Sequence, residues 1–240
     1  MGEGGSRPRI SAIVVRNLGD RLVDVVRNRV LTGAVSPDLP IRQDALAAEL
    51  GVSKIPLREA LAKLEQEGLL RSRANRGFFV RPLSTTEAEE VYALRLALEP
   101  EAVALAAGRM TPEERTEAIR AQELLDRVTH EHDSSVGALN RAFHMALFRP
   151  CRQPITVDIL ARLNVLSERY VRKHLEPLGR DERANHEHRA MLEAWLAGDA
   201  VTVAALTREH IRQTLDDLRR QLESSREKEQ PAETGNQGGA

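Results

Sequence analysis

The sequence predicts a mainly α-helical protein, with an N-terminal winged helix-turn-helix followed by an all-helical bundle of about six helices. Aromatic residues make up only 3% of the 240 residues, and Ala, Leu, Glu and Arg recur at helical spacing over most of the chain. Strand-like residues gather in one short segment, residues 69–82. A chain of this length can form two domains, each with a core of its own.

Three helices are expected in the first domain, because apolar residues recur there every three or four positions over residues 18–32, 42–50 and 54–67. A glycine follows each helix and predicts its end: Gly33, Gly51 and Gly68. Ser53 is a typical N-cap for the third helix, and Pro56 fits its first turn. Two short apolar stretches then flank the polar tip "ANRG", which predicts a β-hairpin.

The second domain is expected to begin at residue 83, where a proline and a short linker precede a new helix N-cap. Capping residues and breakers predict helices near residues 86–109, 112–130, 134–148, 154–174, 181–197 and 199–223. The domains are thus residues 11–82 and 83–223. Residues 1–10 and 224–240 are polar and rich in Gly, Ser or Pro, so we expect them to be disordered.

The charges are divided unevenly along the chain. Residues 1–82 hold 14 Lys and Arg against nine Asp and Glu, a net charge of +5, whereas residues 83–240 carry −6. The first part is therefore the better candidate for binding a polyanion. Cys151 is the single cysteine, and neither a secretion signal nor a bilayer-spanning apolar run is visible. We expect a cytoplasmic protein without a membrane role.

The start of the third helix carries the residues expected to read DNA. An α-helix fits the major groove, and Lys54 and Arg58 lie four residues apart on one face, where either can donate to a guanine. Ser53 and the free N–H groups of the first turn can face phosphate. At the hairpin tip, Arg76 can enter a minor groove or hold a phosphate, and Gly77 permits the tight turn. The alternative is that these cations form an ordinary solvated surface.

Residues 46–80 contain "LAAELGVSKIPLREALAKLEQEGLL" followed by "RGFFV", which resembles the DNA-binding signature of the GntR superfamily of bacterial transcription regulators. The resemblance covers residues 18–82 and implies a winged helix that binds DNA. The candidate DNA-binding residues are Arg42, Ser53, Lys54, Ile55, Arg58, Arg76 and Gly77.

The chain departs from the usual family residues at several of these positions. The family commonly has Arg in place of Lys54, Thr in place of Ile55 and a polar or basic residue in place of Asp44. Lysine cannot make the forked contact of arginine, and an acid near DNA repels phosphate unless a cation or a cytosine amino group meets it. A family-average operator is therefore not expected.

In the second domain, several polar residues fall on faces that should be apolar. Arg95 lies within a stripe that includes Leu94 and Leu98, so it needs an anion. Asn140 and His144 form an i, i+4 pair within another stripe. His188 shares a face with Trp195, whereas His186 shares one with charged residues, so only His188 should point inward. His210 lies at the edge of the last stripe.

Three helices thus each bring a histidine, His144, His188 and His210, toward one interior. Neutral imidazoles with an amide oxygen suit Zn²⁺, Ni²⁺ or Fe²⁺. The alternative is that they are hydrogen-bonded core residues. The histidines near helix ends are expected to cap carbonyls or face water; they are His130, His132 and His174.

Three segments resemble the all-helical FCD effector domain of the FadR branch of GntR regulators: "ALRLALEPEAVALAA", "NRAFHMALF" and "HRAMLEAWLAGDAVTVAALTREH". The resemblance covers residues 86–222. It implies a divalent metal held by Asn140, His144, His188 and His210, with a carboxylate metabolite beside it. Asn140 stands where the family has Asp, so the site should bind metal more weakly because an amide contributes no charge. The candidate effector-binding residues are Arg95 and these four.

Together these features predict a homodimeric transcriptional regulator, a repressor, that binds a palindromic DNA operator and is released or modulated by a small organic acid. Two alternatives remain open. A metal-dependent hydrolase could use the three histidines, although no general base can be named. A ligand-independent DNA-binding protein would explain the winged helix but not the inward polar residues.

Overall fold

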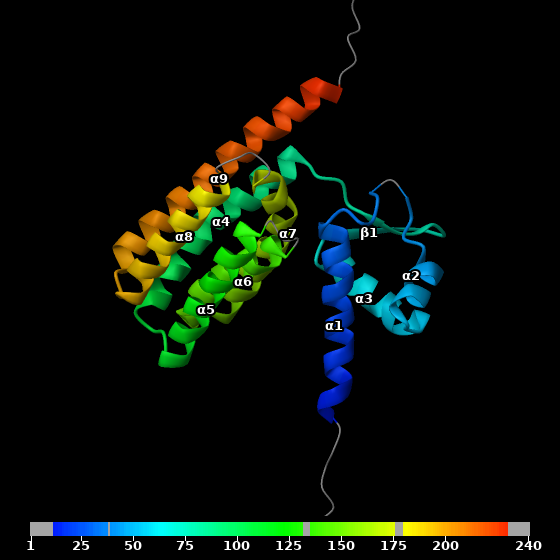
Figure 1. Ribbon diagram of the computed structural model, residues 1–240, viewed down its shortest axis with the longest axis horizontal. Coiled ribbons are helices and arrows are strands. Elements are labelled where there is room, and N and C mark those ends of the chain that lie inside the picture. The colour runs from blue at the N-terminus through cyan, green and yellow to red at the C-terminus, as the bar shows by residue number, and fades with distance from the viewer. Residues whose placement is uncertain (1–11, 38, 132–134, 176–179, 230–240) are drawn as a thin grey trace, which may run out of the picture. The chain divides into compact units, whose positions relative to one another are not determined.

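The computed structural model describes residues 12–37, 39–131, 135–175 and 180–229. These residues form nine α-helices, one short 3₁₀ helix and one two-stranded sheet, which confirms the predicted mainly α-helical class. The chain divides after Pro82 into two compact units, and each is described by itself (Figure 1). Among the described helices, none is long and apolar enough to cross a membrane.

The first unit is a three-helix winged fold. It consists of α1 (Ala12–Leu31), α2 (Gln43–Leu50), α3 (Lys54–Gln66), β1 (Leu70–Arg73) and β2 (Gly77–Val80). Its core is formed by the inward faces of α1 and α3, where Val26, Leu57 and Leu61 are fully buried. Arg27 of α1 is also buried, and its guanidinium makes a bidentate ion pair with Glu67 just after α3, with nitrogen to oxygen distances of 2.9 to 3.2 Å.

Glycines end the helices where the sequence predicts. Gly51 follows α2 with φ = 65°, in the left-handed region that favours glycine, and the chain then turns directly into α3. Ser53 occupies the N-cap of α3 as expected, but its side chain makes no capping hydrogen bond. The first-turn N–H groups of α3 are therefore not satisfied by this hydroxyl.

The wing is an antiparallel hairpin in which Leu70 pairs with Val80 and Arg73 with Gly77. The backbone N–H of Ile41 donates to the carbonyl of Phe78 at 2.8 Å, so the segment before α2 lies along β2. This contact fixes the start of α2 next to the wing.

The second unit is a helical bundle built around α4 (Figure 1). Its elements are α4 (Thr85–Ala107), α5 (Pro112–His130), α6 (Val136–Phe148), η1 (Arg149–Cys151), α7 (Pro154–Leu175), α8 (Arg180–Leu196) and α9 (Ala200–Glu229). α4 packs most extensively along α9 and also contacts α6, α7 and α8. Trp195, Tyr92, Tyr170, Phe143 and Phe148 are the largest fully buried side chains.

Two expectations for this unit were wrong. α9 continues to Glu229, whereas residues 224–240 were expected to be disordered; residues 230–240 lie outside the described part of the chain. The physical reason is that Glu, Lys and Arg are good helix formers, and the first helix breaker in this stretch is Pro231. Leu94 was placed in the apolar stripe of α4 but is 44% exposed. Residues 1–10 lie outside the described part of the chain.

Candidate nucleic-acid interface and metal centre

The N-terminal tip of α3 is a solvent-exposed surface. Ser53, Lys54, Ile55 and Arg58 are all exposed, while Leu57 on the opposite face is fully buried. The tip therefore presents two cations and one large apolar side chain outward, beside the N–H groups of the first helical turn. This is the arrangement that a helix needs to approach base edges and phosphates together.

Both cations of the tip have partners on α2. The Lys54 ammonium lies 2.5 Å from the Asp44 carboxylate, and the Arg58 Nε donates to the Gln43 Oε1 at 3.1 Å. Asp44, the acid that would repel phosphate, thus meets the neighbouring cation that its position requires. The side chains of Lys54 and Asp44 are 62% and 78% exposed, so this pair is screened by water and can be exchanged for a DNA contact at little cost.

The other predicted DNA-binding residues lie near the wing. Arg42 and Arg76 are exposed, and Gly77 has φ = 82°, a left-handed conformation that side chains rarely adopt. A β-carbon at Gly77 would lie 3.6 Å from the Gln43 amide nitrogen, which places the tip end of the wing close to the start of α2. All seven predicted residues belong to the first unit, and their contact with DNA stays a prediction.

Three buried histidines converge inside the second unit. His144 of α6, His188 of α8 and His210 of α9 are 1%, 2% and 7% exposed. One ring nitrogen of each lies within 4.8 Å of the others, and the Nε2 atoms of His188 and His210 are 3.3 Å apart. Within the residues that the structure describes, these three histidines are the group of His, Cys, Asp or Glu side chains close enough together to hold a metal ion.

Two carboxylates orient the cluster. The Nδ1 of His144 lies 2.9 Å from Glu99, and the Nδ1 of His210 lies 2.7 Å from Glu187. Because a carboxylate only accepts, each of these Nδ1 atoms carries the proton and each Nε2 carries a lone pair, which for His144 has no hydrogen-bond partner and for His210 faces the Nε2 of His188. Burial lowers the pKa of His144 to about 4 despite the hydrogen bond with Glu99, so the ring is neutral at neutral pH.

Arg95 is held by a carboxylate of the same protein. Its Nε and Nη2 donate to Glu99 at 2.7 and 3.0 Å, and its Nη1 donates to the Ser167 hydroxyl at 3.1 Å. Burial alone would raise the pKa of Glu99, but the charge of Arg95 and the hydrogen bond from His144 hold it well below its ordinary value. The anion that Arg95 requires is therefore Glu99, and Arg95 reaches the histidine cluster through it.

Several buried polar atoms near this ion pair have no hydrogen-bond partner. They are the Tyr92 hydroxyl, the Asn164 Oδ1 and the His144 Nε2. Asn164 donates to Glu99 at 3.2 Å, and the Arg95 guanidinium lies over the Tyr92 ring, 5.4 Å from its centre. Buried polar atoms are nearly always satisfied, so these three atoms around one ion pair are candidate contacts for a metal, a water or a polar ligand.

The remaining predicted residues of this unit are less buried or not described. Asn140 is half-buried on α6, one turn before His144. His186 is exposed, and His130, also exposed, has its Nδ1 2.6 Å from the Asp126 carbonyl oxygen. His132 and the side chain of His174 lie outside the described residues. Glu99 and Glu187 were not predicted from the sequence. Glu99 follows Arg95 by four residues, a spacing that indicates an ion pair on one face of a helix.

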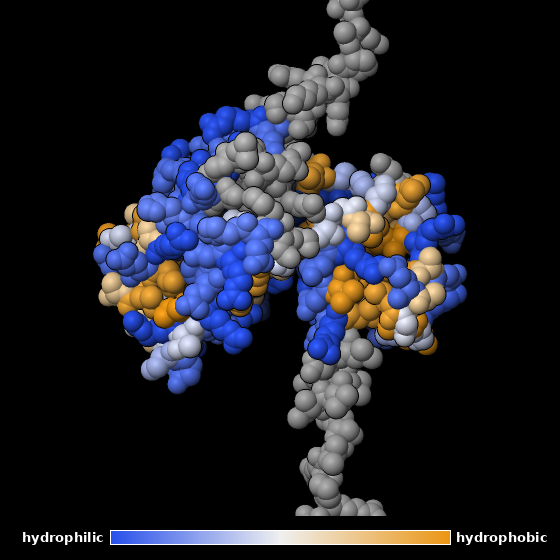
Figure 2. All heavy atoms as spheres, in the orientation of Figure 1, coloured by the Kyte–Doolittle hydropathy of each residue, from blue (hydrophilic) through white to orange (hydrophobic). Residues whose placement is uncertain are grey.

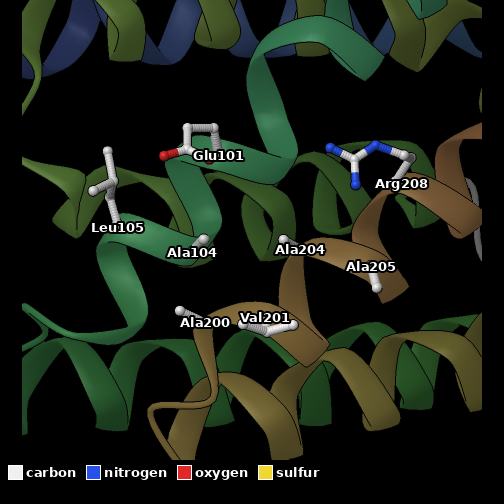
Figure 3. Close-up of a pocket in the computed structure, with 8 residues that line it drawn as sticks. All are labelled: Glu101, Ala104, Leu105, Ala200, Val201, Ala204, Ala205 and Arg208. Atoms are coloured by element: carbon white, nitrogen blue, oxygen red, sulfur yellow. The ribbon is translucent and has the colours of Figure 1, made fainter.

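A separate groove of about 480 Å³ lies between α4 and α9, and none of the three histidines lines it (Figure 3). Small and aliphatic side chains line most of it, with Glu101 and Arg208 as its charged members. Figure 2 shows that the visible surface of each unit is largely hydrophilic, with apolar residues in limited patches. The groove contains none of the buried polar groups described above.

Comparison with known proteins divides the chain in the same way. Residues 18–80 match the gntR family of bacterial regulatory proteins, and residues 90–213 match the FCD domain. The chain is 26% identical to the transcriptional repressor GlaR of Escherichia coli, over 78% of this chain and 89% of that protein. It is 29% identical to a probable D-xylose utilization operon repressor of Paenarthrobacter nicotinovorans, over 74% and 76%.

Other matches are partial. The chain is 32% identical to the uncharacterized regulator YdhC of Bacillus subtilis, but the match spans 51% of this chain and 55% of YdhC. Among solved structures, McbR/YncC of E. coli superposes with a TM-score of 0.72, at 24% identity over 85% of this chain and 98% of that one. At that identity the superposition establishes the shared fold alone.

Proposed function

Because the chain belongs to the GntR family of bacterial transcriptional regulators and carries an FCD domain, we propose that it is a ligand-responsive repressor that binds a palindromic operator as a homodimer. The family places the chain among regulators and not among enzymes, so the hydrolase alternative is set aside. A two-fold dimer matches a palindromic operator, and two tips of α3 give the contacts that one cannot supply for tight binding.

The observation that carries the ligand response is the buried histidine cluster, in which carboxylates orient the rings of His144 and His210. Three imidazoles form a donor set that fits a divalent ion such as Zn²⁺, Ni²⁺ or Fe²⁺. His144, His188 and His210 would hold the ion, and the Asn140 amide oxygen is the proposed fourth ligand. Asn140 lacks the negative charge that an aspartate would bring to the metal. The negative charges of Glu99 and Glu187 nearby compensate for part of this loss.

The ligand proposed for this site is a small organic acid. A bound divalent ion would supply a positive centre for a carboxylate, and the buried Tyr92 hydroxyl, beside Arg95, offers a hydrogen bond within the same region. Arg95 contributes through its ion pair with Glu99, which fixes the His144 ring. To move the protein from mostly DNA-bound to mostly DNA-free, the acid must bind the DNA-free arrangement of the protein more tightly than the DNA-bound one. The difference must amount to a few kcal/mol.

The proposed function is tested by combining thermal unfolding with DNA binding. In the presence of Zn²⁺, one acid of a panel of small mono- and dicarboxylates is expected to stabilise the protein by about 2.7 kcal/mol at 100 times its Kd. The same acid should lower the affinity for an operator selected from random DNA, measured by gel shift. If the protein binds an operator but no acid changes either quantity, the ligand-independent alternative holds.

Metal binding by the cluster has a matched pair of variants on α8. His188→Ala is expected to reduce the bound Zn²⁺ after dialysis to a small fraction of the wild-type content, because the metal loses a buried ligand. His186→Ala, two residues away but exposed, should keep the wild-type content. Metal content is measured by elemental analysis, and equal Zn²⁺ in the two variants would remove His188 from the ligand set.

A further inference from the structure

Ile55 is the most unusual residue of the α3 tip. It is the second residue of the helix, and its relative exposure is 72%, the highest among the exposed large hydrophobic residues whose side chains the structure describes in the first unit. The buried residue Leu57 follows two positions later, about 200° around the helix, so Ile55 points away from the core. An apolar side chain this exposed gains nothing from the fold of the unit in which it lies.

The two cations beside Ile55 contact side chains of α2, whereas the side chain of Ile55 is largely exposed to solvent. Lys54 pairs with Asp44, and Arg58, three positions after Ile55 on the same face, is held by Gln43. The tip thus has an apolar centre between two polar side chains that α2 positions. A side chain without donor or acceptor cannot read a hydrogen-bonding edge, so its partner must be apolar.

The major groove of DNA offers one such group. Each base pair presents donors and acceptors there, and thymine alone adds a methyl group, at C5. We propose that Ile55 contacts the C5-methyl of a thymine next to the base that Lys54 or Arg58 reads, and so selects a T·A pair at that position in each half-site. This inference rests on the proposed function, because it requires that α3 enters the major groove.

The thymine methyl can be removed without any other change by replacing thymine with 2′-deoxyuridine. The operator is first selected from random DNA with the wild-type protein, and each thymine is then replaced in turn. At one thymine of the half-site, the wild-type affinity measured by fluorescence anisotropy is expected to fall about fourfold, the value of one buried methyl group. Ile55→Ala should bind the thymine and deoxyuridine operators equally, and Ile55→Thr, which keeps one methyl, should lie between.

Leu39→Ala is the matched control, because Leu39 is an exposed large apolar residue of the same unit, at 64%, outside α3. It should retain the full wild-type preference for thymine over deoxyuridine. The inference is overturned if no deoxyuridine position weakens wild-type binding, or if Ile55→Ala keeps the preference. Either result leaves DNA reading by the cations of α3 intact. Failure of the wild-type protein to select any operator would instead overturn the proposed function as well.

Discussion

Replacing Lys54 and Arg58 together by alanine is expected to lower the affinity for the operator by about 30-fold to about 20,000-fold for each half-site. A good base contact is worth about 1 to 3 kcal/mol, and the double variant removes one from each cation. The fold should survive, because both side chains are exposed and their partners on α2 remain in water. Gel shift with the selected operator measures the affinity, and circular dichroism checks the helix content.

A second double variant separates reading from charge. Arg29→Ala with Lys63→Ala also removes two cations of the first unit that pair at the surface, with Glu49 and Asp20. These cations lie away from the α3 tip in the sequence, so we expect their loss to change operator affinity by less than about tenfold, through general electrostatics. Equal losses in the two double variants would mean that the tip of α3 contributes charge but no sequence reading.

The turn between α2 and α3 could be predicted nearly residue by residue because its boundaries are set locally, whereas α1 begins at Ala12, six residues before the predicted start. Gly51 ends α2 through its own left-handed conformation, and Ser53 and Pro56 are residues that favour the N-cap and the first turn of a helix. The pairing of Lys54 with Asp44 could not be predicted as a contact, since it joins two helices across a turn. The sequence indicated only that Asp44 needed a cation.

The buried face of α4 was harder to predict for a physical reason. Ala and Leu occur on every side of this helix, so the spacing of apolar residues does not single out one face. The sequence stripe contained Leu94, which is exposed, and omitted Glu99, which is fully buried. Burial of Glu99 becomes favourable only with Arg95 one turn earlier, and such a pair follows from tertiary structure and not from hydrophobicity.

The convergence of the histidines was predictable, but their orientation was not. His144, His188 and His210 each share a face with apolar residues of their own helix, and this local pattern places all three in the interior. Glu187 belongs to α8 yet pairs with His210 of α9, and Glu99 of α4 pairs with His144 of α6. Contacts between helices leave no mark in the spacing of a single helix.

The largest expected change in stability follows from Glu99. This side chain is fully buried and accepts hydrogen bonds from Arg95, His144 and Asn164. Glu99→Leu keeps a similar volume but leaves the Arg95 guanidinium charged and buried without its anion. We expect the free energy of unfolding to fall by about 3 to 5 kcal/mol, measured by urea denaturation of metal-free protein at pH 7.

Two further variants determine whether this loss comes from the buried charge. Glu89→Leu, on the same helix, breaks an ion pair with Arg219 in which both side chains are 44% exposed, and should cost less than about 1 kcal/mol. In the double variant Arg95→Leu, Glu99→Leu the orphaned cation is gone, so most of the stability should return. If the double variant is no more stable than Glu99→Leu, the ion pair is not what Glu99 contributes, and its hydrogen bonds to His144 and Asn164 must account for the loss.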